Sequence, residues 1–548
     1  MKNQSYLRLS CFVAVILILT SSVYAQLTNS ESYAIKGATI VTVSGATIPN
    51  GTVVIRNGLI AAVGAEVVVP ADARIIEGKG MTVYPGLIDS YSSYGVRPPT
   101  PPQAGTGVPQ APGFAQSAGS ADAGLLPEVT VNDLLSINAE TFDPQRNAGI
   151  TSALTSPRDG VFRGRSAFIN LGTESGEKLL LRSPLALSIG FGGARGSYPG
   201  SLMGVFAFLR QSFLDAKNYQ ELWDNYSKSP RGKARPTHNK SLEALLPVIS
   251  GKMPVIFNVT SEREIRRAIS LGEEFNLKYM LSGAGQSYLV SDLLKQKNAT
   301  VLLSLGFPQK PANLDDPESE SLRVLRDRAE APKAAMALSK VGVKFAFTSG
   351  NLTRPTDFIG NASKAVEAGL AKDEAIKALT LYPAQIFGLS EQLGSLEQGK
   401  IANLIVTTGD LFAKDTKIKY TFVDGKQFEI KAPEVPRRGS AAPPATNANS
   451  GAAGNWTLTI NSPAGTMNSP LNIQVDKENV TGEIGSPSGN VAITNGKLNG
   501  NELSFTYSIN FQGQPMTINT KGKIEGNSIN GSMEAMGTSF DFSGVKKP

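Results

Sequence analysis

Residues 83–93 read V-Y-P-G-L-I-D-S-Y-S-S, and this stretch decides the fold. Apolar residues lie on both sides of Pro85-Gly86, and the apolar run ends at Asp89 beside a cluster of hydroxyl side chains. A short apolar run that stops at a carboxylate predicts a buried strand whose end carries polar groups.

The same residues resemble the first barrel strand of the amidohydrolase superfamily, whose motif is P-G-[LF]-[IV]-D-x-H-x-H. In that family the two histidines hold a catalytic metal. The frame from Pro85 to Asp89 is intact here, but Tyr91 and Ser93 stand at the two histidine positions. The resemblance therefore implies a barrel of this family whose metal positions carry other side chains.

A second resemblance lies far along the chain. Residues 374–389 read E-A-I-K-A-L-T-L-Y-P-A-Q-I-F-G-L, and residues 393–406 read L-G-S-L-E-Q-G-K-I-A-N-L-I-V. They resemble the amidohydrolase pattern A-[LV]-T-x-N-P-A-x-x-L-G-L followed by G-S-[IL]-x-x-G-K-x-A-D-[LI]-[VI]. Tyr382 stands where Asn is usual, and Asn403 where Asp is usual. The resemblance covers residues 33–431 and is closest to the imidazolonepropionase-like branch.

The composition limits the chemistry. One histidine and one cysteine occur among 548 residues, whereas a catalytic zinc usually takes three protein ligands. A histidine-rich metal centre is therefore excluded, and the single histidine, His238, lies in a charged turn where we expect it to be solvated. Basic residues outnumber acidic ones by 53 to 46, but the signs alternate along the chain. Without a basic stripe, we expect no nucleic-acid partner.

The first residues are typical of an export signal. Lys2 and Arg8 precede an apolar run over residues 11–19, and Val23 and Ala25 are small residues suited to cleavage before Gln26. The apolar run is too short to span a bilayer. We expect a periplasmic or secreted protein, cleaved near Ala25, with no transmembrane segment and no cysteine afterwards.

Strand and helix patterns alternate from residue 129 to residue 348, which predicts parallel strands covered by helices. The expected fold is α/β: a (β/α)8 TIM-like barrel with a small composite β-sandwich lobe, plus a C-terminal all-β domain. The expected organisation is a signal peptide (1–25), a composite lobe (30–84 and 385–431), a barrel (85–384) with a low-complexity loop (98–127), a linker (432–455) and a C-terminal β-sandwich or barrel module (456–548).

The resemblance also places later ligands at strand ends. Asn258 stands at a histidine position, Ser282-Gly283 where some members have His-Gly, and Gln286 where others have Glu. Gly350 stands where an aspartate is usual, between Ser349 and Asn351. The altered metal positions are thus Tyr91, Ser93, Asn258 and Gly350. The expected polar pocket comprises Asp89, Tyr91, Ser93, Asn258, Ser282, Gln286, Ser349 and Asn351.

Two interpretations of this pocket stay open. Neutral hydrogen-bonding groups suit a small polar ligand, or the pocket has lost its role and only tolerates water. The first hypothesis is a metal-free binding or partner subunit, which pairs with a relative that kept its histidines. The second is a hydrolase of non-peptide C–N bonds, such as cyclic amides or dipeptide-like substrates, with an atypical site. The third is a surface-binding protein that acts through its C-terminal module. No cofactor is expected, although family members bind zinc or another divalent metal.

Overall fold

The computed structural model describes residues 32–97, 125–137, 141–173, 179–192, 198–310, 320–350, 352, 354–430, 452–462, 465–476, 478–486, 489–511, 514–535 and 538–546. These residues fall into two compact units. One unit contains the described residues up to 310 and from 320 to 430, and the other contains those from 452 onward. The predicted signal peptide, most of the predicted loop and most of the predicted linker lie outside the described residues.

One sheet of the first unit combines strands from both ends of that unit. Its order is β18-β17-β16-β5-β1-β2-β3, with β4 paired to β1. The strands are β1 (Tyr33–Ile40), β2 (Ile48–Arg56), β3 (Leu59–Gly64), β4 (Arg74–Glu77), β5 (Thr82–Pro85), β16 (Leu404–Thr407), β17 (Ile418–Val423) and β18 (Lys426–Glu429). β5 pairs antiparallel with β16, so the first residues of the 83–93 motif, Val83 to Pro85, join the L-I-V segment that follows Asn403.

The remaining strands of this unit form two sheets. One has the order β10-β9-β7-β6 and the other β15-β14-β13-β12-β11-β8. The strands are β6 (Leu87–Ser92), β7 (Ile150–Thr155), β8 (Phe162–Arg165), β9 (Ala167–Asn170), β10 (Leu180–Arg182), β11 (Leu187–Gly190), β12 (Val255–Val259), β13 (Tyr279–Gly283), β14 (Thr300–Ser304) and β15 (Phe345–Thr348). β6 and β7 run parallel, as do β11 to β15, and β15 lies beside β6.

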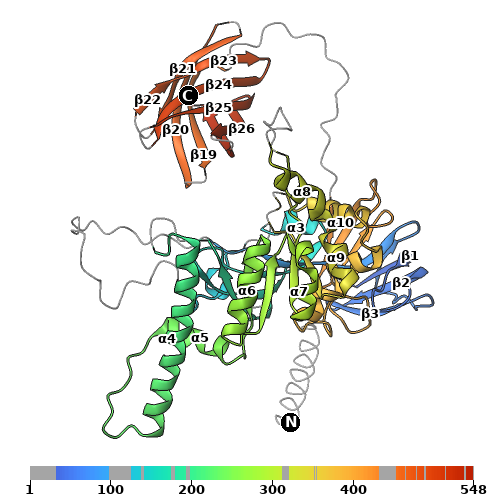
Figure 1. Cartoon of the computed structure of the whole chain (residues 1–548). Helices are drawn as coiled ribbons and strands as arrows, with labels where there is room; N and C mark the ends of the chain where they lie inside the picture. The colour runs from blue at the N-terminus through green and yellow to red at the C-terminus, as the bar shows by residue number, and fades with distance from the viewer. Residues whose placement is uncertain are drawn as a thin grey trace, which may run out of the picture. The chain divides into compact units, whose positions relative to one another are not determined.

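Helices follow most of these strands, as the alternating pattern predicts. They are α2 (Val131–Leu134), α3 (Asp143–Asn147), α4 (Leu202–Lys228), α5 (Lys240–Ile249), α6 (Glu262–Glu274), α7 (Ser291–Gln296), α8 (Leu322–Glu330), α9 (Ala334–Val341), α10 (Asp357–Glu367), α11 (Lys372–Leu379) and α12 (Leu381–Ile386), with short 3-10 turns at Ser287–Leu289 and Ala331–Lys333. Figure 1 shows α4 as a long helix with α5 beside it. A capping box begins α6, with Ser261 and Glu264 bonded reciprocally.

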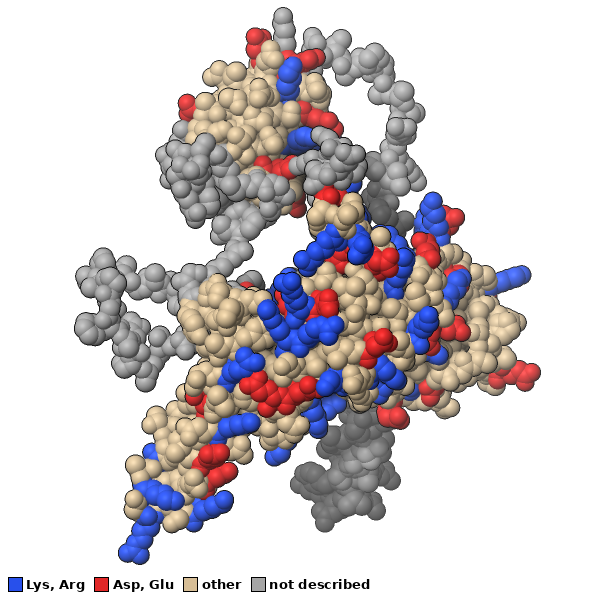
Figure 2. All heavy atoms as spheres, viewed as in Figure 1, with Lys and Arg blue, Asp and Glu red and all other residues tan. Residues whose placement is uncertain are grey.

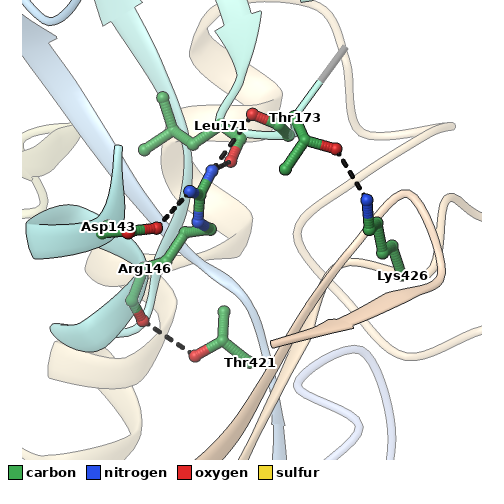
Figure 3. Close-up of polar contacts among 7 residues, drawn as sticks. Asp143, Arg146, Leu171, Thr173, Thr421 and Lys426 are labelled. Carbon is green, nitrogen blue, oxygen red and sulfur yellow. Dashed lines mark hydrogen bonds and ion pairs between the residues drawn. The ribbon is translucent and has the colours of Figure 1, made fainter. Parts of the chain in front are cut away.

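A buried arginine joins α3 and the residues after β9 to the composite sheet (Figure 3). The Arg146 guanidinium on α3 donates to the carbonyl oxygens of Leu171 (2.8 Å) and Gly172 (3.1 Å), and it pairs with Asp143. Its backbone oxygen accepts from Thr421 Oγ1 at 2.8 Å on β17. The guanidinium also lies 4.4 Å from the ring centroid of Phe428 on β18. The position of the composite sheet against α3 is thus fixed by directional bonds as well as by apolar packing.

Asn403 has a structural role at the same junction. Its Nδ2 donates to Asn170 Oδ1 at 2.9 Å, and its Oδ1 accepts from the Asp424 backbone N at 2.9 Å. Asn170 in turn donates to Asp424 Oδ1 at 2.6 Å. The amide at residue 403 is therefore used as both donor and acceptor.

The second unit is a closed antiparallel β barrel. Its strands are β19 (Gly454–Ser462), β20 (Gly465–Asp476), β21 (Asn479–Ser486), β22 (Gly489–Ala492), β23 (Thr494–Asn499), β24 (Glu502–Phe511), β25 (Gln514–Glu525), β26 (Ser528–Ala535) and β27 (Thr538–Lys546). The ring closes because β20 pairs with both β19 and β21. Buried apolar side chains, including Trp456, Phe505 and Phe542, fill it.

No helix in the described ranges is both long enough and apolar enough to cross a membrane. Figure 2 shows basic and acidic side chains intermixed on the visible face, as the alternation of charges in the sequence indicates.

Candidate functional site

The carboxyl ends of the parallel strands bring most of the predicted site residues to one end of the first unit. Asp89 and Tyr91 lie on β6, Asn258 on β12 and Ser282 on β13. In the ladder, Asn258 is opposite Gly190 on one side and Ser282 on the other. Strand ends at this edge carry the active sites of barrel enzymes, so we call this region the mouth.

Asp89 is the centre of the first hydrogen-bond network at the mouth. Its side chain is fully buried. Oδ1 accepts from the backbone N of Tyr91 (3.2 Å) and of Ser349 (3.0 Å), and Oδ2 accepts from Tyr94 Oη at 2.7 Å. Burial raises the pKa of Asp89, against the opposing effect of these donors. Burial and the neighbouring Asp89 both raise the pKa of Tyr94, so its hydroxyl remains a protonated donor.

Tyr91 belongs to a second network. Tyr91 Oη lies 2.6 Å from Ser188 Oγ on β11, and Asn258 Nδ2 donates to the same Oγ at 3.1 Å. Asn258 Nδ2 also contacts the Ile189 carbonyl oxygen at 3.2 Å. Two of the altered metal positions are therefore hydrogen-bonded through a shared serine hydroxyl.

The position of the usual aspartate has no room for a side chain. Gly350 follows β15 with φ +57°, and a Cβ added there would lie 2.0 Å from Ser304 Oγ and 2.9 Å from Ser304 Cβ. The Gly350 backbone N donates to Thr348 Oγ1 at 3.1 Å, and that hydroxyl donates to the Tyr91 carbonyl oxygen at 2.5 Å. A carboxylate at residue 350 would require Ser304 to move.

These residues do not fit a divalent metal. Asp89 is the carboxylate that the predicted site contributes, and three protein donors already occupy its oxygens. The side chains around it are hydroxyls and amides, which are weak ligands for zinc-type ions. Within the ranges given above, no group of three or more His, Cys, Asp or Glu side chains is arranged to hold a metal ion. We therefore derive no chemical step through a metal.

The other predicted residues are placed differently. Gln286 Oε1 accepts from the Glu262 backbone N at 3.0 Å, so its side chain satisfies a backbone donor in the first turn of α6. Ser93 lines a cavity of about 400 Å³ beside the mouth. His238 is exposed and paired with Glu243 at 2.7 Å. Asn351 lies outside the described residues.

Sequence reasoning missed Tyr94 and Ser188. Tyr94 lies five residues after Asp89, beyond the motif, and Ser188 lies in a buried strand that carried no family signal. A single hydroxyl residue within an otherwise apolar strand, as in L-S-I-G, is the one signal that would have indicated Ser188.

Comparisons with known proteins agree with this description. A sequence profile described as Amidohydrolase family matches residues 259–428. The crystal structure of an amidohydrolase from Thermotoga maritima MSB8 is similar, with 23% sequence identity and a TM-score of 0.60; the similarity covers 73% of this chain and 100% of that one. A prolidase complexed with N-methylphosphonate-L-proline has 16% identity and a TM-score of 0.44, with the same two coverages.

A third similarity is local. N-acetylglucosamine-6-phosphate deacetylase from Haemophilus influenzae is 46% identical over 71 residues, which are 13% of this chain and 17% of that enzyme. The chain thus matches about a sixth of the length of this curated relative.

At 23% identity, the likeness to the Thermotoga structure shows a shared fold over 73% of this chain. In this chain that fold is mixed α/β, and the second unit is a closed β barrel. Residues 259–428, from the end of β12 into β18, are the part of the chain that matches the amidohydrolase family profile.

Proposed function

We propose that the whole first unit is an amidohydrolase-type (β/α)8 barrel that binds a small organic ligand at its mouth without a catalytic metal. The observation that supports this most strongly is the state of Asp89, whose buried carboxylate is engaged by Tyr91, Ser349 and Tyr94. A metal ligand needs a free oxygen lone pair directed at the ion, whereas this carboxylate is directed into a protein network.

Metal content is the decisive experiment. The mature chain from Gln26 would be purified without chelators, incubated with excess Zn²⁺ or Mn²⁺, desalted and analysed by elemental mass spectrometry. We expect far less than one ion per chain. The matched control is Tyr91→His/Ser93→His/Asn258→His, which places imidazoles at three altered positions and should retain more zinc. A stoichiometric transition metal in the unaltered chain would overturn the proposal and favour an atypical hydrolase.

The local similarity to a deacetylase is consistent with descent from enzymes that cleave C–N bonds. Such hydrolysis in this fold relies on a metal-activated water. Because the residues at the mouth do not fit a metal, binding is the function that the geometry supports better.

We also propose export, with cleavage near Ala25, and association with a relative that retains its metal histidines. Both proposals rest on the sequence. Amino-terminal sequencing of the native envelope fraction tests cleavage, and affinity purification from that fraction tests the partner, where a solitary monomer would count against it. Deletion of residues 456–548 tests whether the C-terminal barrel is needed for export or for association with the partner.

A further inference from the structure

A cavity of about 400 Å³ lies next to the mouth, and its polar wall is strongly basic. The ionisable side chains that line it are those of Arg97, Arg158, Arg163 and Asp159, and Ser93 adds a hydroxyl. Three guanidinium groups thus face one carboxylate. A cavity of this size suits a small organic molecule.

The arginines of the cavity have no carboxylate partner, in contrast to Arg210 and Arg328. Arg210 and Arg328 each pair with a glutamate, at 2.7 Å and 2.6 Å. Within the described part of the chain, Arg97, Arg158 and Arg163 form no ion pair or side-chain hydrogen bond, and Arg163 Nε is buried with no acceptor. Arg97 and Arg158 are exposed to water, whereas the unpaired donor at Arg163 Nε is buried and therefore costly. An anionic ligand would supply an acceptor that the described residues do not.

Arg163 also connects the cavity to the mouth. Its guanidinium lies against Gly190 at the end of β11, where an added Cβ would lie 2.3 Å from Nη2. Gly190 is the ladder neighbour of Asn258, one of the altered metal positions. Arg158 is close enough to Tyr94 for its positive charge to oppose the increase in the pKa of that hydroxyl. The basic wall is therefore adjacent to both polar networks.

The rest of the cavity wall is apolar. Val129, Leu134 and Pro157 line it, together with Val96 and Leu126. A bare inorganic anion would satisfy the arginines but leave these side chains in contact with water. A molecule with an anionic group at one end and an apolar body at the other fits both parts. Because guanidinium groups bind carboxylates through two parallel hydrogen bonds, a carboxylate suits the basic end.

We propose that this cavity binds a small organic acid, with its carboxylate on Arg163 and Arg158 and its apolar body against Val129 and Leu134. This inference names the ligand class for the mouth and therefore rests on the proposed binding function.

Calorimetry with two matched pairs of probes tests the ligand class. The pairs are N-acetyl-L-phenylalanine with N-acetyl-L-phenylalaninamide, and octanoate with octanamide. We expect at least one acid to bind the full mature chain, and its neutral amide to bind at least about tenfold more weakly. Equal binding of acid and amide, or no binding of either acid, would overturn the inference. If inorganic phosphate binds as tightly as the acids, the inference that an apolar body of the ligand contributes to binding is wrong.

Variants test the location. Arg163→Met keeps the length of the side chain without its charge, and it should weaken acid binding by about tenfold while leaving amide binding unchanged. Arg158→Met changes an exposed residue and serves as a second variant if Arg163→Met fails to fold, which thermal unfolding would show. The control is Arg231→Met, an exposed arginine outside the cavity. If neither cavity variant weakens acid binding, or if Arg231→Met weakens it as much as they do, the acid does not bind in this cavity.

The two proposals can fail separately. A stoichiometric metal together with preferential binding of the acid would refute the metal-free function but support the organic-acid site. No metal together with equal binding of acid and amide would refute the organic-acid site but support the metal-free function.

Discussion

Replacement of Tyr94 by phenylalanine should destabilise the first unit in a pH-dependent way. The hydroxyl donates to the buried Asp89 carboxylate at 2.7 Å and lies 3.3 Å from Ser349 Oγ. A hydrogen bond to a charged group contributes about 2 kcal/mol, and a bond between neutral groups contributes about 1 kcal/mol. We therefore expect Tyr94→Phe to lower the free energy of unfolding by about 2 kcal/mol where Asp89 is ionised and by about half as much where it is protonated.

The direction of the pH dependence follows from the raised pKa of Asp89. Because the folded chain holds this proton more tightly than the unfolded chain, the contribution of Asp89 to stability is fully present below the ordinary aspartate pKa of about 3.9. It is lost as the pH rises through the raised pKa of the folded chain. Removal of the Tyr94 donor destabilises the ionised form further, so the loss in Tyr94→Phe should grow as the pH rises.

The assay is urea unfolding followed by tryptophan fluorescence at about pH 4 and about pH 8, values that bracket the titration of a carboxyl with a raised pKa. The chain has two tryptophans, Trp223 in the first unit and Trp456 in the second. A Trp456→Phe background therefore restricts the signal to the first unit. Tyr198→Phe is the matched control, because that ring is 61% exposed. An equal loss at both pH values, or no loss beyond that of the control, would refute the assigned network.

Three further perturbations test the remaining contacts, each by the same urea titration of the first unit. Gly350→Ala should lower the free energy of unfolding by about 1–3 kcal/mol, because of the positive φ and the 2.0 Å approach to Ser304 Oγ. The double variant Ser304→Gly/Gly350→Ala should lose less than the sum of the two single variants. Additive losses would contradict the contact. Arg146→Met should lose about 3 kcal/mol or more, since it leaves buried carbonyl oxygens without their donor, and a loss within experimental error would contradict its role at the junction. Asn403→Asp introduces the usual family residue yet should lose about 1–3 kcal/mol, because it removes the donor to Asn170 and places a second carboxylate near Asp424; Asp424→Asn should restore part of that loss.

The parts of the fold that depend on local sequence could be predicted. The strand β6 follows from the apolar run before Asp89, although it continues to Ser92 rather than ending at Asp89. The start of α6 follows from Ser261 and Glu264, three residues apart. Closure of the C-terminal barrel was left open between a sandwich and a barrel. It depends on the pairing of β20 with both β19 and β21, which alternation within each strand does not determine.

The sequence predicted which residues lie at the candidate site more readily than it predicted the hydrogen bonds between them. Family positions indicated Asp89, Tyr91 and Asn258, but the serine that links the last two is 97 residues from Tyr91 in the sequence. Such a contact depends on which strands become neighbours and in which register. Gln286 shows the reverse case, since a residue at a family position near the mouth has its side chain bonded at a helix start instead.

The pairing of β5 with β16 has a consequence for how the chain acquires its structure. Some three hundred residues separate these two neighbours in the sequence. During synthesis, the edge of β5 that pairs with β16 therefore stays unpaired until nearly the whole first unit has been made. Non-local pairing of this kind slows folding. Any truncation before β16 should therefore yield a fragment that associates with itself along that open side rather than a smaller working protein.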